Sequence, residues 1–429
     1  MKIAVIGAGF TGLSAAFYLS KSGHDITVFE KDSLPGGLAI GHKEKNWQWT
    51  LEKHYHHWFT NDKSILNLAK QINHEIIIKR PKTSIAVNEN IYQFDSPLSV
   101  LSFPLLSFFE RLRMGIVIAF LKFEPFWKPL EKYNASKILP QLMGKKAYEM
   151  IWEPLFINKF GKFANNISLA WFWARIVKRT PSLAYPKGGF LEFAKVLTKK
   201  IENNDGKFYF DTEISEVSSI AKPKIKFHKI GDSKIEVENF DTIIVTTLSS
   251  IFLDVAYKLP QDYKNKLGNL KSLGATNLIL RLKKPFFKDN TYWLNVCDKN
   301  APMMAIVEHT NFMDKKNYDN EHLLYLGNYK DINDKFFSMT KEDILKLFDP
   351  YLKKINPDYS NNIIGFEFLK DPFAQPIIPT NYSKIIPSFK TPLKNVYLAN
   401  IQQVYPWDRG TNYAIEMGEK VAKLLLRDN

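Results

Sequence analysis

The 429-residue chain contains a single cysteine, Cys297. An intrachain disulfide needs two cysteines, and structural zinc sites and iron–sulfur clusters usually take several thiolates. The sequence therefore excludes an internal disulfide and any cysteine-based metal cage, and we predict no metal site. The lack of disulfides also agrees with a cytoplasmic location, which we keep as an expectation.

No part of the sequence is apolar for long enough to predict a helix that spans a membrane. Such a helix needs ~20 predominantly apolar residues, whereas the nearest stretch, "MGIVIAFLKF" at Met114–Phe123, is much shorter and follows Glu110, Arg111 and Arg113. Residues 1–22 are partly apolar, but glycines interrupt them and a charged strand follows in place of a cleavage site. We therefore predict neither a spanning segment nor a signal peptide.

Blocks of like charge are also missing, although the formal net charge is +15. The lysines are spread along the chain, so we predict no basic tail and no nucleic-acid partner. The excess charge favours anionic partners such as phosphorylated ligands or acidic lipid headgroups. The hydrophobic fraction of 45% and the aromatic fraction of 14% are those of a folded protein that is large enough for two or three domains.

What the sequence does contain, within its first 30 residues, is the pattern of a βαβ unit. Lys2–Ile6 is a short apolar run typical of a buried parallel strand. Leu13–Ser22 has apolar residues at helical spacing, and Asp25–Glu30 is a second strand-like run. Gly-Ala-Gly-Phe-Thr-Gly stands between the first strand and the helix, at residues 7–12. The pattern predicts an α/β fold that begins with a Rossmann-like domain.

Each glycine of this turn has a mechanical reason. Gly7 permits the tight turn, Gly9 lets a pyrophosphate approach the backbone, and Gly12 lets the helix pack closely on the strand. The helix N-terminus then presents free N–H groups to the phosphates. Glu30, at the end of the second strand, is placed to accept hydrogen bonds from both ribose hydroxyls and would repel a 2′-phosphate. The combination predicts a dinucleotide site that disfavours NADP.

A second glycine pair, Gly36-Gly37 in "EKDSLPGGLA", follows the acidic residue. This string resembles the extended fingerprint of FAD enzymes in the amine oxidase, protoporphyrinogen oxidase and phytoene desaturase superfamily, in which the pair comes close to the phosphates and ribityl chain. "LPQLMGKKAYEMIWEPLFINKFG" at Leu139–Gly161 is similar to the protoporphyrinogen oxidase pattern. The resemblance covers nearly the whole chain and implies FAD as the cofactor.

Two later segments resemble the parts of the superfamily that return to the FAD domain. Tyr185–Val217 has a Gly-Gly turn, an amphipathic helix and a strand, with Ile214 where the backbone meets adenine in relatives. The C-terminal segment has a strand, a loop and a helix that begins near Gly410, which lies under the flavin pyrimidine in relatives. Asn400 and Ile401 replace the superfamily's Gly-Asp pair, and of the two only Asn400 can offer the ribityl chain a polar side chain.

The glycine motif, the acidic residue and the resemblance together give one set of expected FAD contacts. They are Gly7, Ala8, Gly9, Phe10, Thr11, Gly12, Glu30, Lys31, Gly36, Gly37, Leu38, Ile214, Asn400, Gly410, Thr411 and Asn412.

The resemblance divides the chain into a discontinuous FAD-binding domain of the GR2 type and an inserted α+β substrate domain. The FAD-binding domain comprises residues 1–75, 185–250 and 388–429, and the substrate domain comprises residues 76–184 and 251–387. Within the substrate domain we expect helices over 97–183 and a sheet over 268–330 that roofs the flavin.

No catalytic residue follows from the sequence, but several side chains are candidates for the substrate cavity. "LEKHYHHWF" at Leu51–Phe59 reads as a strand, from which Tyr55 or His56 would line the cavity, and it lacks enough ligands for a metal. Glu308, at the end of a sheet strand, is either an acid, base or orienting group or part of a solvated turn. In "YPWDRGTN", Tyr405 and Trp407 are expected to form an aromatic wall, and Asp408 with Arg409 a structural ion pair.

The stretch Ser96–Leu130 is apolar, aromatic and edged with basic residues. Two alternatives stay open for it. Its helices either rest on an acidic bilayer surface, as the resemblance implies for enzymes with lipid-soluble substrates, or pack inside the substrate domain. The first alternative would associate the protein with the inner face of the membrane.

We interpret the sequence as a FAD-dependent oxidoreductase that transfers a hydride from a small organic substrate to flavin N5. One alternative is an enzyme similar to UDP-galactopyranose mutase, which arginines and lysines facing the cavity would favour. The other is a non-catalytic FAD-binding protein. No sequence feature specifies the substrate, the electron acceptor or the oligomeric state.

Overall fold

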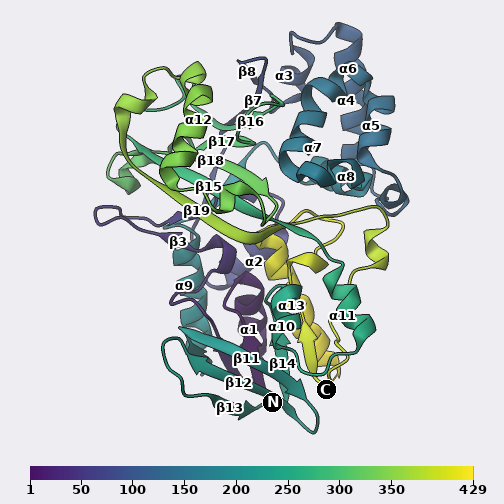
Figure 1. Cartoon of the computed structure of the whole chain (residues 1–429), viewed down its shortest axis with the longest axis vertical. Helices are drawn as coiled ribbons and strands as arrows, with labels where there is room; N and C mark the ends of the chain where they lie inside the picture. Colours follow the sequence, from purple (N-terminus) through teal and green to yellow (C-terminus); the bar gives the residue numbers. More distant parts are fainter. Residues whose placement is uncertain (429) are drawn as a thin grey trace.

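The computed structural model describes residues 1–428 and contains a five-stranded, fully parallel sheet at one end of the molecule (Figure 1). Its strand order is β10-β2-β1-β14-β20. The strands come from distant parts of the chain: β1 (Lys2–Ile6), β2 (Asp25–Phe29), β10 (Lys207–Tyr209), β14 (Thr242–Val245) and β20 (Val396–Leu398). Residues 1–75, 185–250 and 388–428 thus share one sheet, whereas the domain limits themselves stay a prediction.

Helices α1 (Phe10–Lys21), α9 (Phe190–Glu202), α13 (Thr411–Asp428) and α2 (Lys63–Gln71) pack beside this sheet. The predicted βαβ unit is confirmed, and α1 begins before Leu13 because extended Gly9 forms its N-cap. Helices α1 and α13 lie so close that a Cβ on Gly418 would come within 2.3 Å of the Thr11 carbonyl oxygen. The amino-terminal turn and the carboxy-terminal helix are therefore direct neighbours.

An antiparallel meander lies at the outer edge of this end of the molecule (Figure 1). Its strands are β11 (Thr212–Ser219), β12 (Pro223–Lys229) and β13 (Glu236–Asn239). Two short helices, α10 (Ser249–Val255) and α11 (Gln261–Gly268), then lead towards the second sheet.

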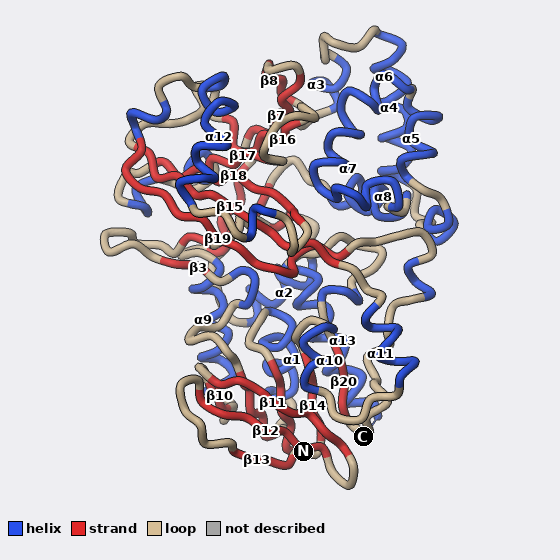
Figure 2. The backbone as a smooth tube through the Cα atoms, viewed as in Figure 1, coloured by secondary structure: helices blue, strands red, loops and turns tan. Residues whose placement is uncertain are grey.

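The second sheet is mixed, has seven strands and carries α12 (Lys341–Ile355) on one face (Figure 2). In spatial order the strands are β19 (Ile363–Pro376), β15 (Ser272–Leu282), β18 (His322–Lys330), β17 (Ala305–Glu308), β16 (Thr291–Val296), β7 (Lys82–Val87) and β8 (Asn90–Gln93). The sheet expected over 268–330 forms the centre, but that prediction was too narrow. Residues 82–93 and 363–376 add strands at the two edges of the expected sheet. There β7 pairs with β16, and β19 pairs with β15.

A helical lobe stands beside the second sheet, as predicted for residues 97–183 (Figure 2). Ser96 and Ser107 begin its first two helices with capping boxes, which satisfy backbone N–H groups of the first turn. The helices are α3 (Pro97–Leu101), α4 (Phe108–Phe123), α5 (Ala135–Met143), α6 (Lys145–Ala147), α7 (Glu153–Phe160) and α8 (Leu169–Lys178), with a π-helical turn at Tyr148–Trp152.

Short elements complete the chain. Two small antiparallel sheets pair β3 (Gly41–His42) with β4 (Leu51–Glu52), and β5 (Trp58–Phe59) and β6 (Ile76–Lys79) with β9 (Leu183–Pro186). The 3₁₀ turns are Gly37–Ala39, Lys128–Lys132, Gly161–Asn166, His309–Asn311, Lys315–Tyr318, Lys335–Phe337, Tyr359–Asn362, Tyr382–Lys384 and Ile401–Gln403.

Candidate active site

The glycine turn after β1 has the close backbone contacts that its sequence predicts. Gly7 has a φ of +101°, and a Cβ on Gly12 would lie 1.9 Å from the Gly7 carbonyl oxygen. The second glycine pair folds back onto this turn, since Gly36 N–H donates to the Ala8 carbonyl at 2.9 Å. A Cβ on Gly37 would stand 3.0 Å from Gly9 Cα. Both glycine segments therefore form one surface on which only backbone is presented.

The N-terminus of α1 opens onto this surface. Its N-cap is Gly9, and no side chain caps the helix. The first N–H groups of a helix have no partners within it and carry partial positive charge. An uncapped helix start beside two glycine segments suits a diphosphate, whose oxygens can accept from these N–H groups.

Glu30 lies directly after β2, beside the same turn. Its Oε2 accepts from Ala8 N–H at 2.6 Å and its Oε1 from Asp32 N–H at 2.9 Å. Burial raises the pKa of this carboxyl above its ordinary value. Further lone pairs of the carboxylate stay available to ribose hydroxyls. The neighbouring Lys31 is exposed and pairs with Glu213 at 2.6 Å, so its ammonium group is occupied by the protein.

A polar atom without a partner also lies next to the glycine turn. Thr247 Oγ1 is buried and makes no hydrogen bond, and the Cγ2 of the same side chain would be 3.7 Å from a Cβ on Gly7. Buried hydroxyls are normally paired. A bound dinucleotide would supply such a partner, so the residues present fit the predicted cofactor.

Two expected contacts farther along the chain have different surroundings. Ile214 lies on β11 at a bulge, close to Glu30, whose carbonyl accepts from Thr212 N–H at 2.9 Å. Asn400 is buried, and its side chain caps the 3₁₀ turn Ile401–Gln403 while donating to the Thr247 carbonyl at 3.0 Å. The Asn400 amide is therefore engaged by the protein itself, and the expected contact of this side chain with a ribityl chain stays a prediction.

The start of α13 follows Gly410, as predicted, and is fixed by bonds to neighbouring elements. Thr411 Oγ1 accepts from the Trp58 indole at 2.7 Å, and Asn412 Oδ1 accepts from Ile65 N–H at 3.1 Å. Of the other expected contacts, Phe10 and Thr11 are buried and Leu38 is half-buried. The helix start at Gly410 and Thr411 opens into a cavity.

This cavity has a volume of about 350 Å³ and lies where the helical lobe, the seven-stranded sheet and the start of α13 meet. Helices α7 and α8 supply aromatic and cationic side chains to one wall, and β7, β16 and β18 supply a second wall. The segment Tyr55–Phe59 completes it. Concave sites at such junctions are common ligand sites.

Four of the lining side chains are basic: Lys159, Arg175, Arg179 and Arg409. Asp408 also lines the cavity, accepting from Arg175 at 2.5 Å and from the Trp171 indole at 3.0 Å. The cations beside it, Lys159 first, hold the pKa of Asp408 below its ordinary value despite burial. The expected ion pair between Asp408 and Arg409 is wrong, because Arg409 instead bonds Gln375 and the Tyr329 hydroxyl.

The structure places Tyr55 and His56 in the cavity lining, although the strand expected there is wrong. Residues 53–57 are irregular, and the ring of His54 contacts Asn277 and Asp371. His56 Nδ1 lies 2.6 Å from the His54 carbonyl. A carbonyl only accepts, so Nδ1 carries the proton and Nε2 is left as an acceptor. Burial lowers the pKa of His56 to about 3, so the ring is neutral.

The other three cavity candidates lie outside the lining. Glu308 is fully buried and accepts from the backbone N–H groups of Phe286 and Phe287, so it is neither an active-site acid nor part of a solvated turn. Tyr405 turns towards the helical lobe and donates to Glu131 at 3.1 Å. Trp407 stacks on Trp173, so the expected aromatic wall is not at the cavity.

The sequence did not single out Lys159, Arg175 or Arg179 for the site. They lie in or just after the last turns of α7 and α8. Basic residues are common at such positions because they interact favourably with the helix dipole. The packing of α7 and α8 against the Asp408 loop brings Lys159 and Arg175 together.

The parallel sheet, the uncapped glycine turn and the adjoining cavity define a dinucleotide-binding enzyme fold with a separate substrate domain. The family model of flavin-containing amine oxidoreductases matches residues 10–426, and the chain belongs to that family. The resemblance stated from the sequence is confirmed, and the protein is a flavin-dependent oxidoreductase by family.

Individual proteins show the same relationship at lower similarity. A 15-cis-phytoene desaturase of Synechococcus elongatus is 26% identical over 156 residues, which is 32% of this chain and 33% of that enzyme. An oxidoreductase structure from Methanosarcina mazei has a TM-score of 0.76 at 17% identity, over 99% of this chain and 100% of that one. A reduced UDP-galactopyranose mutase structure has a TM-score of 0.77 at 13% identity, over 100% of this chain and 94% of that one. At these identities the structures establish the fold alone.

Proposed function

We propose that the flavin is FAD and that the enzyme removes a hydride from an organic substrate held in the cavity. The observation that carries the choice of FAD is the backbone surface made by Gly9 and Gly37 beside the uncapped start of α1, with Glu30 at its edge. A mononucleotide has neither the pyrophosphate that this surface suits nor the second ribose for the carboxylate. When bound, FAD supplies the acceptor for the hydride.

The residues of the chain would bind and orient the substrate and would exclude water from it. The free N–H groups at the start of α13 favour negative charge at the end of the cavity formed by Gly410 and Thr411. Neutral His56 offers Nε2 as an acceptor, which suits a substrate hydroxyl or N–H group better than a cation. The aromatic lining restricts water around the reacting atoms.

The test of this function is spectroscopic. The purified protein should show the visible absorption of an oxidised flavin, and mass spectrometry of the released cofactor should identify FAD. Loss of that absorption on addition of a substrate without oxygen would establish the redox reaction. Folded protein that neither contains nor takes up FAD would contradict the proposal.

A second function is favoured by one observation, the four basic side chains in the cavity. These charges would also suit a sugar nucleotide, the substrate class of the mutase with the same fold. A mutase leaves the flavin with no net change of redox state, whereas the oxidoreductase bleaches it in proportion to product. Product formation without net flavin reduction would therefore favour the mutase.

We also propose that α3 and α4 rest on an acidic bilayer surface. Large apolar side chains follow one stripe of α4 with most of their area exposed, including Phe109 at 79%, Ile116 at 60% and Phe123 at 83%. Arg111 and Arg113, on the same helix, bond to carbonyl oxygens and to no carboxylate within residues 1–428, which leaves their charge for lipid phosphates. Among residues 1–428 no helix has the length and apolar character needed to cross a membrane. An interfacial contact is consistent with this geometry.

A further inference from the structure

The charges of the cavity do not suit the amine that the family description names. An amine substrate is an ammonium ion at neutral pH, and a low-dielectric cavity that holds several cations repels it. The lining of this cavity contains three guanidinium groups, from Arg175, Arg179 and Arg409, as well as Lys159. The net charge of the cavity lining therefore indicates which charge the substrate carries.

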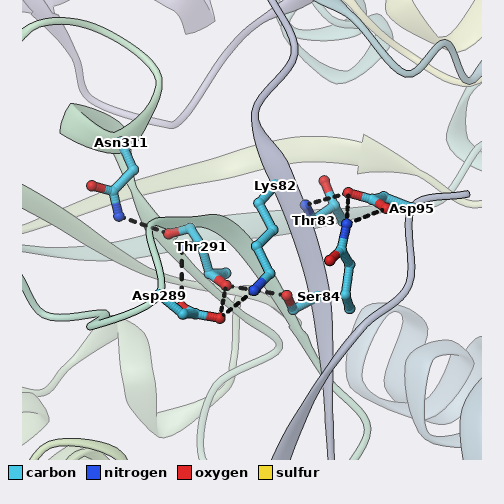
Figure 3. Close-up of polar contacts among 8 residues, drawn as sticks. Lys82, Thr83, Ser84, Asp95, Asp289, Thr291 and Asn311 are labelled. Atoms are coloured by element: carbon cyan, nitrogen blue, oxygen red, sulfur yellow. Dashed lines mark hydrogen bonds and ion pairs between the residues drawn. The ribbon is translucent and has the colours of Figure 1, made fainter. Parts of the chain in front are cut away.

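The two carboxylates in the lining compensate these cations only in part. Asp408 is shared between Arg175 at 2.5 Å and Lys159 at 3.4 Å. Asp95, just after β8, is held by the β7–β8 hairpin, where it accepts from Thr83 N–H at 3.3 Å and from the Gln93 amide (Figure 3). In Figure 3 the side chains of Ser84, Asp289 and Thr291 bond to one another beside β7 and β16, outside the cavity lining.

The guanidinium groups stay charged at neutral pH. Burial lowers the pKa of Arg409 only to about 10, so this guanidinium group keeps its charge. Burial lowers the pKa of Lys159 well below its ordinary value, although Asp408 opposes this shift. Even with Lys159 neutral, three positive groups face two carboxylates.

Arg179 differs from the other two arginines in having no hydrogen-bond or ion-pair partner for its side chain within residues 1–428. Arg175 is committed to Asp408, and Arg409 to Gln375 and Tyr329. Arg179 follows the last turn of α8 and is accessible to solvent. Its planar fork of donors is matched in geometry to a carboxylate or phosphate.

One part of the lining is apolar. Ile151, Leu155, Phe156 and Phe172 of the helical lobe face the cavity, as does Met304 before β17. These side chains can bury hydrocarbon, at a gain of roughly 25 cal/mol for each Å² removed from water. The cavity thus combines an apolar wall with an unpaired guanidinium group.

We propose that the substrate is an organic anion, with an apolar body and a carboxylate or phosphate group that Arg179 binds. This inference rests on the proposed function for the identity of the site, but it concerns the charge of the ligand and not the reaction. It predicts that the enzyme selects against amines.

The test compares three probes with the same tail and different heads: octyl phosphate, octanoate and octylamine. Binding to the FAD-loaded protein is measured by calorimetry below the concentrations at which the probes form micelles. Loading with FAD blocks the dinucleotide site, so a phosphate probe cannot bind there. Octyl phosphate, octanoate or both should bind at least tenfold more tightly than octylamine, and the two anions distinguish phosphate from carboxylate recognition.

Variants assign the effect to Arg179. Arg179→Gln should weaken binding of the favoured anion about tenfold, and Arg179→Lys should retain most of it. Arg80→Gln, at an exposed site outside the cavity lining, is the matched control and should leave binding unchanged. Equal or tighter binding of octylamine, or unchanged anion binding in Arg179→Gln, overturns the inference. Those results leave FAD binding and flavin reduction intact, whereas failure to bind FAD contradicts the proposed function alone.

Discussion

Glu52 is a carboxyl group with no exposed surface, between the start of α9 and strand β18 of the second sheet. It accepts from the Tyr185 hydroxyl and from Phe190 N–H at 2.9 Å. Burial outweighs these bonds and raises the pKa of Glu52 to about 7. The folded protein therefore holds a proton at this site that the unfolded chain releases near pH 4.5.

We expect Glu52 to make stability depend on pH. Because its folded pKa is raised, the folded state binds more protons than the unfolded state between about pH 4.5 and pH 7, and the free energy of unfolding falls as pH rises through that window. The shift corresponds to at most about 3 kcal/mol. Urea unfolding at several pH values should show the slope in the wild type and a reduced slope in Glu52→Gln. Glu236→Gln, at an exposed site, is the control. An identical slope in Glu52→Gln would contradict this assignment.

Gly37 allows a second test at the scale of one residue. It has a φ of +57° and faces Gly9 Cα, whereas Gly23 has a φ of +80° and no atom within 4 Å of the position that a Cβ would take. Both Gly→Ala changes carry the cost of a left-handed alanine, roughly 1 kcal/mol. Only Gly37→Ala also intrudes on the diphosphate surface, so it should weaken FAD binding at least tenfold while Gly23→Ala leaves it unchanged. Fluorescence titration of the apoprotein with FAD measures both, and equal affinities would count against this placement of the cofactor.

Single residues also show what the sequence can and cannot predict. The steric roles of Gly7 and Gly12 were predicted from the sequence because their spacing is local and each has one role, whereas the role of Glu30 stays a prediction. Arg179 was not, because an arginine at a helix end looks the same whether it faces solvent or a cavity. The prediction for Glu308 was wrong because its backbone partners, Phe286 and Phe287, lie in the loop between β15 and β16 and cannot be inferred from its neighbours in sequence.

At the scale of elements, the local periodicities predicted β1, α1, β2, α9 and α13 well, since each has its pattern within one segment. The sequence failed where tertiary partners decide the structure. Residues 53–57 alternate like a strand, yet His54 bonds Asp371 from β19 and the segment stays irregular. Strand β19 itself was missed because it pairs across a long separation in sequence.

The contact between α8 and the loop before α13 depends on Asp408. Its carboxylate accepts from Arg175 and Trp171, and only 15% of its side chain is exposed. Removing one partner of a buried ion pair typically costs about 3–5 kcal/mol because the remaining charge is left uncompensated. Asp408→Asn should therefore lower the free energy of unfolding by about 3 kcal/mol, as measured by urea denaturation.

An exposed ion pair provides the comparison for Asp408. Glu75 pairs with Lys187 at 2.7 Å, and both side chains are more than half exposed. Such pairs contribute about 0–1 kcal/mol, so Glu75→Gln should change stability by less than 1 kcal/mol. Equal destabilisation by the two variants would show that the Asp408 cluster does not stabilise this contact.

At the scale of the whole molecule, the parallel sheet with the glycine turn lies at one end and the helical lobe at the other, with the cavity at their junction with the second sheet (Figure 1). Lys122 connects the lobe surface to this cavity, because its ammonium group binds the carbonyls of Ile176, Val177 and Arg179 at the end of α8. The apolar face of α4 and the proposed anion-binding arginine thus belong to adjoining helices. A lipid surface at α4 would place an amphipathic substrate near the cavity.

The membrane contact yields a prediction for the intact protein. Phe109 and Phe120 are exposed on α4, at 79% and 58%. Replacing both by Glu removes apolar area and adds two negative charges, so binding to vesicles that contain acidic lipid should fall at least tenfold. Co-sedimentation measures the bound fraction, and FAD content reports whether the fold is retained. Ile235→Glu, an exposed apolar site on the distant meander side, is the matched control and should bind vesicles like the wild type. If the double variant keeps its FAD and still sediments with acidic vesicles as the wild type does, α4 is not the face that meets the bilayer, and another partner must cover its apolar stripe.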